Sequence, residues 1–361
     1  MNAGRVSSSH LNLLATRTAL PALRHEGSAV EEAFAGWLSS QSRAVQVKGQ
    51  RILRNAGVEA RHSFLTLEEI FTPCGLTESM SRYREHATDL GEQVLRAGLA
   101  EAGVEAQDVD VLITTSCTGY MIPSVDAYLV ERLGMRADVV RLPVTEMGCA
   151  AGASALIYAS EMLQGRPGRT AAVVNLEFPT NTMQHEDFSM DNIVGTALFS
   201  DGAACTVLRC EEEAGRVRIV DWAMHQVEAT TGILGYQLTD TGLRMNLDPT
   251  LPEVIGDHFE SATRALLERN GLTLDDVSNF VIHPGGVKIL DRIGELLEGR
   301  GGDVGLSREV MRRFGNMSSS TVIFILDALL NGELKGGPTL LMSFGPGFGA
   351  HQVLMDVRID T

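Results

Sequence analysis

The chain has 361 residues, of which 44% are hydrophobic and 21% are charged. This composition is typical of a globular protein, and the length allows two ordinary domains or one large layered domain. Its 30 Lys and Arg against 46 Asp and Glu give a net charge of −16. An acidic surface repels phosphate backbones and anionic lipid, so we do not expect nucleic acid as a partner.

Neither a secretory signal nor a membrane span is predicted. Residues 1–21 contain no uninterrupted apolar core of the kind that a signal peptide needs. No stretch of about 18 or more apolar residues, enough to span a bilayer, occurs in the chain. We therefore expect a cytoplasmic protein without membrane insertion.

The cysteines predict free thiols. Their number is odd, and they form no CxxC pair and have no nearby histidine at ligand spacing, which argues against a disulfide framework and a zinc site. We expect no bound metal. The five are Cys74, Cys117, Cys149, Cys205 and Cys210.

A basic cluster stands out early in the chain. Between residues 43 and 61 the only acid is Glu59, whereas the basic residues are Arg43, Lys48, Arg51, Arg54 and Arg61. The cluster fits either a binding site for an anionic small ligand or a solvated helix face, and its composition leaves both interpretations open.

The chain contains an internal repeat. Residues 95–117 and 265–286 both read as a helix, a glycine stop, Asp-Val and a buried strand. At nearly the same displacement, residues 147–165 match residues 314–332, each with a glycine, one polar residue, small residues and a long apolar helix. A strand is predicted after each of these helices. The period is too long for a solenoid and indicates a duplicated domain.

The duplication predicts the layout of the fold. Its strands are too uniformly apolar to have a solvent face, so we expect two sheets covered by helices on both sides. Residues 197–208 and 344–359 read as hairpins turned at Ser-Asp-Gly and Gly-Pro-Gly. We place the join in the polar stretch 209–217, which gives an N-terminal half, 1–210, and a C-terminal half, 211–361.

The repeat puts Cys149 and Asn316 at matching places, each at the start of a buried helix. A helix N-terminus carries partial positive charge, which is expected to lower the pKa of the thiol and to bind an oxyanion. Small residues on both sides of Cys149 let an acyl chain approach the sulfur. A buried cysteine is otherwise commonly a small hydrophobe, but its position in the repeat favours a functional role.

His283 is the predicted partner of this thiol. It ends an apolar strand and is followed by Pro-Gly-Gly, which places its ring at the strand edge where ligand sites of α/β proteins collect. A thiol needs a base or an imidazolium partner to react at neutral pH. Asn316 adds an amide donor, and the three residue types together suit acyl transfer.

Four motifs resemble those of type III polyketide synthases, the chalcone synthase-like condensing enzymes of the thiolase superfamily. They are GCAAG around Cys149, HPGG at His283, GNMSSS at Asn316 and SFGPGFG at residues 343–349. The resemblance extends from near residue 45 to the end of the chain. It implies an α/β thiolase-like fold with αβαβα layers, made of two duplicated halves and assembled as a homodimer.

The resemblance also implies catalytic roles. Cys149 would carry the acyl group, and His283 with Asn316 would promote decarboxylation of malonyl-CoA and stabilise the resulting enolate. Acyl-CoA and malonyl-CoA would be the substrates, and no metal, flavin or nicotinamide would be needed as a cofactor.

Substrate contacts follow from the same resemblance. Phe199 would gate the active-site tunnel, and Ile122 or Met121 would reach the partner subunit's cavity. The CoA phosphates would be held by Lys48, Arg51, Arg54 and Arg61. The cavity would be shaped by Cys117, Thr118, Glu177, Pro179 and Thr182, and by the loop residues Ser343, Phe344, Gly345 and Pro346.

The sequence departs from plant members of this family. Ser343 replaces the first glycine of the usual loop, Pro179 replaces a threonine, and residues 116–124 resemble bacterial members. With only 5% aromatic residues, these features favour a fatty acyl starter and an alkylpyrone or alkylresorcinol product. Short or aromatic starters, and a naphthalene product made from malonyl units alone, stay open.

Three other functions compete with this interpretation. A ketoacyl synthase III-like enzyme would condense once and form no ring, although the Gly-Pro-Gly hairpin argues against it. A non-catalytic acyl-binding dimer partner commonly lacks the cysteine that is present here as Cys149. A degradative thiolase would want a second cysteine near the C-terminal hairpin, and none follows Cys210.

Overall fold

The computed structural model describes residues 9–332 and 334–359. Of residues 1–21, in which no signal peptide is predicted, the first eight lie outside the described range. Nine strands form one mixed sheet. In sheet order they are β11 (Asn279–Ile282), β12 (Gly337–Gly345), β13 (Gly349–Val357), β8 (Val217–Gln226), β1 (His10–Ala19), β7 (Gly202–Glu211), β6 (Thr170–Glu177), β4 (Val111–Thr115) and β5 (Val140–Val144).

The pairing of the strands repeats in the two halves of the chain. Strands β1, β7 and β6 are antiparallel neighbours, and β6 then pairs with β4 in parallel. The order β8, β13, β12 and β11 has the same pattern of directions. This symmetry bears out the internal repeat that the sequence predicts.

The expectation of two separate sheets was wrong in one respect. Strands β1 and β8 meet where the halves adjoin and pair over Leu11 with Ile219 and Asn12 with Arg218. Each would otherwise leave unpaired backbone groups at a sheet edge, and this pairing removes that edge. The two halves therefore form one continuous sheet.

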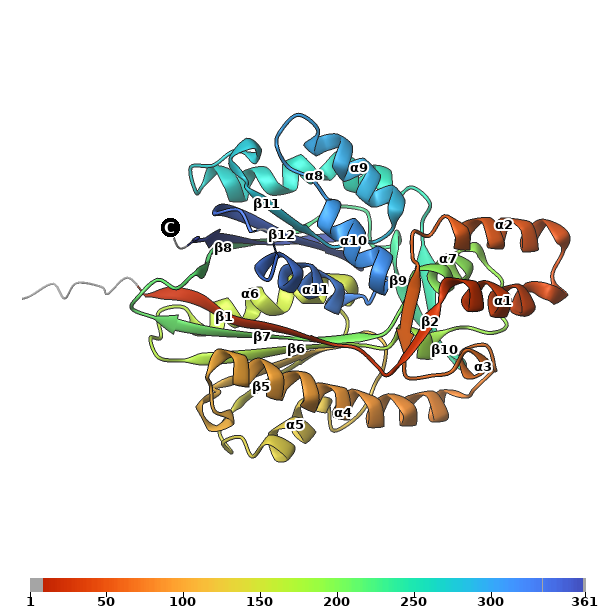
Figure 1. The fold of residues 1–361 in the computed structure, drawn as a ribbon, viewed down its shortest axis with the longest axis horizontal. Coiled ribbons are helices and arrows are strands. Elements are labelled where there is room, and N and C mark those ends of the chain that lie inside the picture. Colours follow the sequence, from red (N-terminus) through yellow and green to blue (C-terminus); the bar gives the residue numbers. More distant parts are fainter. Residues whose placement is uncertain (1–8, 333, 360–361) are drawn as a thin grey trace, which may run out of the picture.

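Two central helices lie between the two halves of the sheet, and a pair of outer helices covers the other face of each half (Figure 1). The central helices, α6 (Ala151–Leu163) and α11 (Ser319–Leu330), contact each other and strands of both halves. The first half is covered by α4 (Leu76–Ala102) and α5 (Val125–Leu133), and the second by α8 (Leu251–Glu268) and α9 (Val287–Leu297). This is the expected αβαβα layering.

Burial on both faces explains why the strands are so apolar. Every residue of β6 is buried, because α4 packs on one face of this strand and α6 and α11 pack near the other. The central helices also approach closely: a Cβ on Gly152 would lie 2.5 Å from the Ser319 carbonyl oxygen. Glycine at this position lets the starts of α6 and α11 come together.

Most of the other elements gather at one end of the layered body (Figure 1). They are β2 (Leu23–Glu26), α1 (Gly27–Trp37), η1 (Leu38–Ser40), α2 (Arg43–Arg54), β3 (Ala60–Ser63), α3 (Leu67–Ile70), α7 (Met190–Leu198), β9 (Leu234–Thr239) and β10 (Gly242–Leu247). Helix α10 (Gly305–Phe314) precedes α11, and η2 (Ala106–Asp108) and η5 (Leu274–Asp276) precede β4 and β11.

One of the two predicted hairpins is present. Strands β12 and β13 pair antiparallel up to Gly345 and Gly349, as the Gly-Pro-Gly turn predicts. The hairpin at residues 197–208 was a wrong prediction, because α7 runs to Leu198 and β7 begins at Gly202. The buried Asp201, in the connection between α7 and β7, accepts hydrogen bonds from the N–H and the hydroxyl of Thr180.

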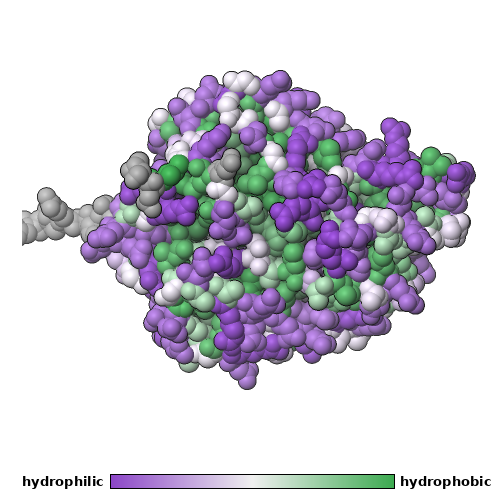
Figure 2. Space-filling view, viewed as in Figure 1, coloured by the Kyte–Doolittle hydropathy of each residue, from purple (hydrophilic) through white to green (hydrophobic). Residues whose placement is uncertain are grey.

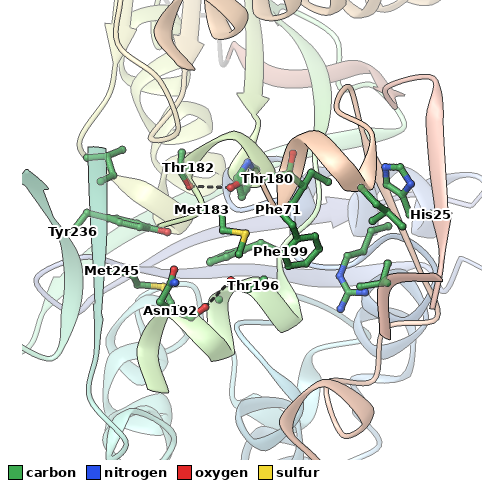
Figure 3. Close-up of a pocket in the computed structure, with 17 residues that line it drawn as sticks. His25, Phe71, Thr180, Thr182, Met183, Asn192, Thr196, Phe199, Tyr236 and Met245 are labelled. Carbon is green, nitrogen blue, oxygen red and sulfur yellow. Dashed lines mark hydrogen bonds between the residues drawn. The ribbon is translucent and has the colours of Figure 1, made fainter. Parts of the chain in front are cut away.

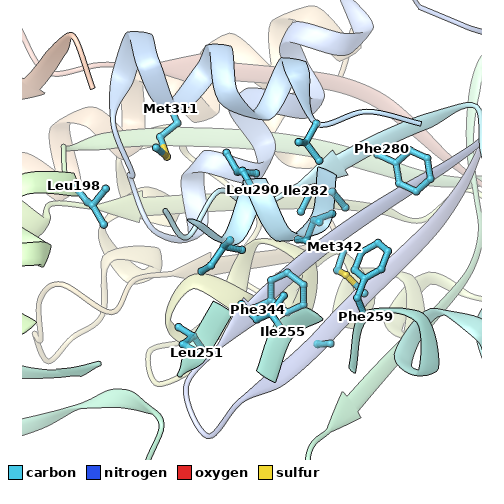
Figure 4. Packing of buried hydrophobic residues seen from close by; sticks show 14 of the residues in the cluster. Leu198, Leu251, Ile255, Phe259, Phe280, Ile282, Leu290, Met311, Met342 and Phe344 are labelled. Carbon is cyan, nitrogen blue, oxygen red and sulfur yellow. The ribbon is translucent and has the colours of Figure 1, made fainter. Parts of the chain in front are cut away.

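The apolar core continues to the edge of the site. Phe344 of β12 and Leu251 and Ile255 of α8 lie in one buried cluster (Figure 4). Hydrophilic side chains cover most of the face shown in Figure 2, with apolar ones between them mainly near its middle. Within the described residues, no helix has both the length and the apolar character needed to cross a membrane.

Candidate active site

Cys149, His283 and Asn316 line the same cavity, although they come from three distant parts of the chain. Cys149 belongs to η3 (Gly148–Ala150), just before α6, whereas Asn316 precedes α11 and His283 follows β11. Phe199 and Phe344 line this cavity as well. We call it the Cys149 cavity.

The Cys149 thiol is held by a hydrogen-bonding contact to the second half. Its sulfur lies 3.4 Å from the Ser318 hydroxyl oxygen. Burial raises the pKa of the thiol to about 12, although the Ser318 hydroxyl acts in the opposite direction. This direction is opposite to the lowering expected from the helix N-terminus, because desolvation of the thiolate outweighs it.

His283 is buried with an exposed fraction of 1%. Its backbone N–H donates to the Met342 carbonyl at 2.9 Å, whereas neither ring nitrogen has a hydrogen-bond partner among the described residues. Burial lowers the pKa of the ring to about 4, so the imidazole is neutral at pH 7. Burying ring nitrogens without hydrogen-bond partners costs free energy. An oxygen atom of a ligand would supply the partner that the ring lacks.

Asn316 is fixed by four hydrogen bonds to described residues, and none of them uses its side-chain nitrogen; the weakest is from the Thr321 hydroxyl to the side-chain oxygen at 3.5 Å. Its N–H donates to the Leu198 carbonyl at 2.9 Å, and its carbonyl accepts from the Ser200 N–H at 2.9 Å. The side-chain oxygen accepts from the Ser318 N–H at 2.9 Å. Because that oxygen is occupied, the NH2 group is the end that faces a ligand.

A polar network lies beside the nucleophile. The Cys117 thiol lies 3.3 Å from the Ser318 hydroxyl and 3.4 Å from the Glu177 carboxylate. Glu177 also accepts from the Cys117 N–H at 3.1 Å and from the Thr118 hydroxyl at 3.0 Å. Burial raises the pKa of Glu177 to about 7. Ser318 thus links this network to Cys149.

A second cavity adjoins the first (Figure 3). Pro179 and Thr182 line it, as does Phe199 at its centre. Phe199 also lines the Cys149 cavity, together with Gly195 and Met245. These three residues are therefore the wall between the two cavities, and Phe199 stands where a gate would act.

The basic cluster divides into two parts. Lys48, Arg51 and Arg54 are exposed on α2, and Arg54 pairs with Glu31 at 2.5 Å. Arg61 is buried on β3 and lines the second cavity. Arg61 thus lies apart from the other three, because its strand faces the interior.

The C-terminal hairpin packs against the turn that carries Cys149. Pro346 lies against Gly148, and Gly345 lies against Ala150. Ser343 is buried, and its hydroxyl has no hydrogen-bond partner among the described residues. The predicted loop residues thus support the nucleophile's turn, and Phe344 is the one that lines its cavity.

Several residues of the site could not be recognised from the sequence. Ser318 belongs to the GNMSSS motif, but nothing in the sequence indicates that its hydroxyl contacts both the Cys117 and the Cys149 thiols. Tyr236 and Met245 come from β9 and β10, outside every motif. Burial raises the pKa of Tyr236 well above its usual range. All five cysteines are free thiols, and the described residues contain no group of three or more His, Cys, Asp or Glu suited to a metal.

Comparison with known families identifies the chain. Residues 2–211 match the family "Chalcone and stilbene synthases, N-terminal domain", and residues 220–358 match the corresponding C-terminal domain. The chain belongs to the chalcone and stilbene synthase family. It is a type III polyketide synthase, an acyltransferase that condenses CoA thioesters, as its motifs predict.

Individual relatives agree with this assignment. The chain is 35% identical over 352 residues to 1,3,6,8-tetrahydroxynaphthalene synthase of Streptomyces peucetius subsp. caesius, covering 95% of this chain and 92% of the relative. It is 29% identical to the phloroglucinol synthase of Pseudomonas fluorescens, covering 84% and 88%.

A solved structure confirms the thiolase-like fold. The crystal structure of 1,3,6,8-tetrahydroxynaphthalene synthase from Streptomyces coelicolor A3(2), a bacterial type III polyketide synthase, superposes with a TM-score of 0.89 at 26% identity. The match covers 97% of this chain and 100% of that one. The ketoacyl synthase III and degradative thiolase alternatives share this fold, so it is the family match, and not the superposition, that argues against them.

Proposed function

We propose that Cys149 takes an acyl group from an acyl-CoA starter, which is then extended by repeated condensation with malonyl-CoA and cyclised in the same cavity. The observation that carries this proposal is the convergence of Cys149, His283 and Asn316 on one cavity. The three supply a nucleophile, a proton acceptor and a neutral donor.

Loading begins with a proton transfer. Burial favours the neutral thiol and the neutral imidazole. The thiol therefore passes its proton to the His283 ring as the sulfur attacks the thioester carbonyl. The carbon–sulfur bond to CoA breaks, and the CoA thiolate takes the proton from His283. The products are acyl-Cys149 and free CoA.

Extension uses the neutral donors. The bond between malonyl-CoA and its carboxylate breaks, CO2 leaves, and the electron pair becomes a thioester enolate. The His283 ring N–H and the Asn316 NH2 group stabilise the enolate oxygen. The enolate carbon attacks the acyl carbonyl of acyl-Cys149, the carbon–sulfur bond breaks, and a β-ketoacyl-CoA and the Cys149 thiolate form. For another round the thiolate attacks the thioester carbonyl of the β-ketoacyl-CoA, the CoA thiolate leaves and takes a proton from solvent, and the chain is again held on Cys149.

The lining of the Cys149 cavity supports a fatty acyl starter, which would give an alkylpyrone or an alkylresorcinol. Beside Phe199 and Phe344, the apolar residues of its wall are Val194, Leu198, Leu234, Met245, Leu247, Leu251, Ile255 and Ile289. Such a wall stabilises an alkyl chain by removing it from water.

A second starter is supported by the relatives. Two of them, from Streptomyces peucetius and Streptomyces coelicolor, are named as synthases of tetrahydroxynaphthalene, a product without an alkyl tail. In this alternative malonyl-CoA supplies both the starter and the extension units.

We also propose that CoA binds at α2 and that the enzyme is a homodimer. Lys48, Arg51 and Arg54 are exposed cations in an acidic protein and suit CoA phosphates. Ile122 is 78% exposed and Tyr120 63%, so this loop presents two large side chains that a second copy would cover. Strand β5 ends the sheet and offers an edge for a second copy.

The test is product formation by the purified protein with malonyl-CoA alone and with hexanoyl-CoA, dodecanoyl-CoA or benzoyl-CoA. The expected result is a cyclic product that contains two or more malonyl-derived units, identified by mass. A non-catalytic partner would release no CoA. Absence of any product with two such units from every starter would overturn the proposal.

A further inference from the structure

Arg61 is a buried cation beside the second cavity. It is 5% exposed and lines the wall that includes Phe199 and Thr182. One of its terminal nitrogens donates to the Ala197 carbonyl, in the last turn of α7, where a cation is favourable. Its Nε has no hydrogen-bond partner among the described residues.

No carboxylate compensates this charge. Among residues 9–332 and 334–359, no Asp or Glu lies within ion-pair distance of Arg61, although many other arginines of the protein have such a partner. Burial lowers the pKa of Arg61 to about 10, so it stays charged at pH 7. A buried charge is normally paired, and the cavity is the direction from which a partner can arrive.

The rest of this cavity suits a chain rather than a compact anion. Its apolar walls are Val30, Leu67, Ile70, Phe71, Met183 and Leu243. Figure 3 shows Tyr236 and Met245 at one end, Phe71 and His25 at the other, and Phe199 between them. Because Phe199, Gly195 and Met245 also line the Cys149 cavity, a chain on Cys149 that passes Phe199 enters here.

We propose that the second cavity receives the far end of the acyl chain on Cys149, and that Arg61 binds an oxygen atom of that end. This inference rests on the proposed function. The oxygen belongs either to the carboxylate of a dicarboxylyl starter or to a ketone of the growing poly-β-keto chain. A saturated alkyl end would leave the guanidinium unpaired, so Arg61 favours the malonyl-derived starter, the second of the two starters proposed above, over a fatty acyl starter.

The experiment compares two acyl groups of equal length. Adipyl-CoA and hexanoyl-CoA differ only at the end far from the thioester, and their transfer to Cys149 is followed by intact-protein mass. We expect Arg61→Met to lower the adipyl-to-hexanoyl ratio of loading rates about tenfold, the loss of one charge-assisted hydrogen bond. Arg264→Met is the matched control, because Arg264 is an exposed arginine of α8 that lines neither cavity.

A second readout separates the two sources of the oxygen. With malonyl-CoA as the only extender, the malonyl-derived units are counted in the products of wild type, Arg61→Met and Arg264→Met. A changed loading ratio identifies the carboxylate of a starter. Fewer units in Arg61→Met, with an unchanged ratio, identify the ketones of the growing chain.

The inference is overturned if Arg61→Met changes neither the loading ratio nor the number of units relative to Arg264→Met. Equal losses for adipyl and hexanoyl loading, with products of normal length, also overturn it. If Arg61→Met shows no melting transition, Arg61→Lys replaces it, and the same readouts decide. Absence of acyl transfer to Cys149 from any CoA contradicts the proposed function instead.

Discussion

Gly148 and Pro346 lie in direct contact, although one precedes the nucleophile and the other turns the C-terminal hairpin. A Cβ on Gly148 would lie 2.6 Å from Pro346 Cδ. Gly148 also has φ of +52°, which L side chains rarely adopt. The contact therefore couples two of the motifs that identify the family and seats the Cys149 turn against the hairpin.

Replacing Gly148 by Ala is predicted to destabilise the fold. The added methyl group meets Pro346, and the backbone keeps its left-handed conformation, so we expect the free energy of unfolding to fall by about 2–4 kcal/mol. Gly165→Ala is the control, because Gly165 has φ of +69° but, apart from its chain neighbours, no atom of the described residues lies within 4 Å of an added Cβ. Urea unfolding measures both variants, and equal losses would show that the Pro346 contact contributes nothing.

His283→Gln is predicted to slow alkylation of Cys149 by iodoacetamide at pH 7 by about 10²-fold, the usual contribution of a positioned base. The glutamine fills similar space but cannot accept the thiol proton. His351→Gln is the matched control, because His351 is also a buried histidine but binds Ser154 at 2.7 Å. Peptide mass spectrometry follows the modified Cys149, and an unchanged rate in His283→Gln would show that the imidazole does not activate the thiol.

Ser318 combines a strained backbone with its contacts to two thiols. Its φ of 47° and ψ of −125° suit glycine. Both Ser318→Gly and Ser318→Ala remove the hydroxyl, but only glycine relieves the backbone, so we expect the glycine variant to be more stable by about 1 kcal/mol. Thermal and urea unfolding compare the two, and an alanine variant of equal or greater stability would exclude the strain.

Glu177 is predicted to make stability depend on pH. Burial raises its pKa from 4.5 to about 7, so the folded protein retains a proton that the unfolded chain has lost. Its contribution is therefore favourable at low pH and is lost as the pH rises from about 4.5 to 7. Between pH 4 and pH 8, the free energy of unfolding of Glu177→Gln should therefore rise by about 3 kcal/mol relative to that of the wild type.

Urea unfolding at several pH values measures this difference. The exposed Glu85→Gln is the matched control and is expected to give a constant difference from wild type. A Glu177→Gln variant that runs parallel to wild type over this range would contradict the prediction.

The sequence predicts those parts of the fold that follow local rules. The apolar strands, the repeated helix starts and the Gly-Pro-Gly hairpin depend on neighbouring residues, and all are present. The positions of Cys149 and Asn316 in the repeat were enough to predict that they lie close together, because symmetric halves bring equivalent helix starts to one axis.

Other features depend on contacts between distant segments. Ser-Asp-Gly at residues 200–202 looks like a hairpin turn, but Asp201 is buried and accepts from the Thr180 N–H and hydroxyl at 2.9 and 2.6 Å. The composition around Arg61 likewise does not reveal that β3 faces inward. Tyr236 joins the site from β9, and no local pattern marks it.

The central claim is that Cys149 carries the acyl group, and the most direct test is mass analysis of the protein after incubation with hexanoyl-CoA. The account predicts one acyl group on the peptide that contains Cys149 in the wild type and none in Cys149→Ser, with both proteins folded. Acyl transfer to Cys149→Ser at the wild-type rate would contradict the account and place the nucleophile elsewhere.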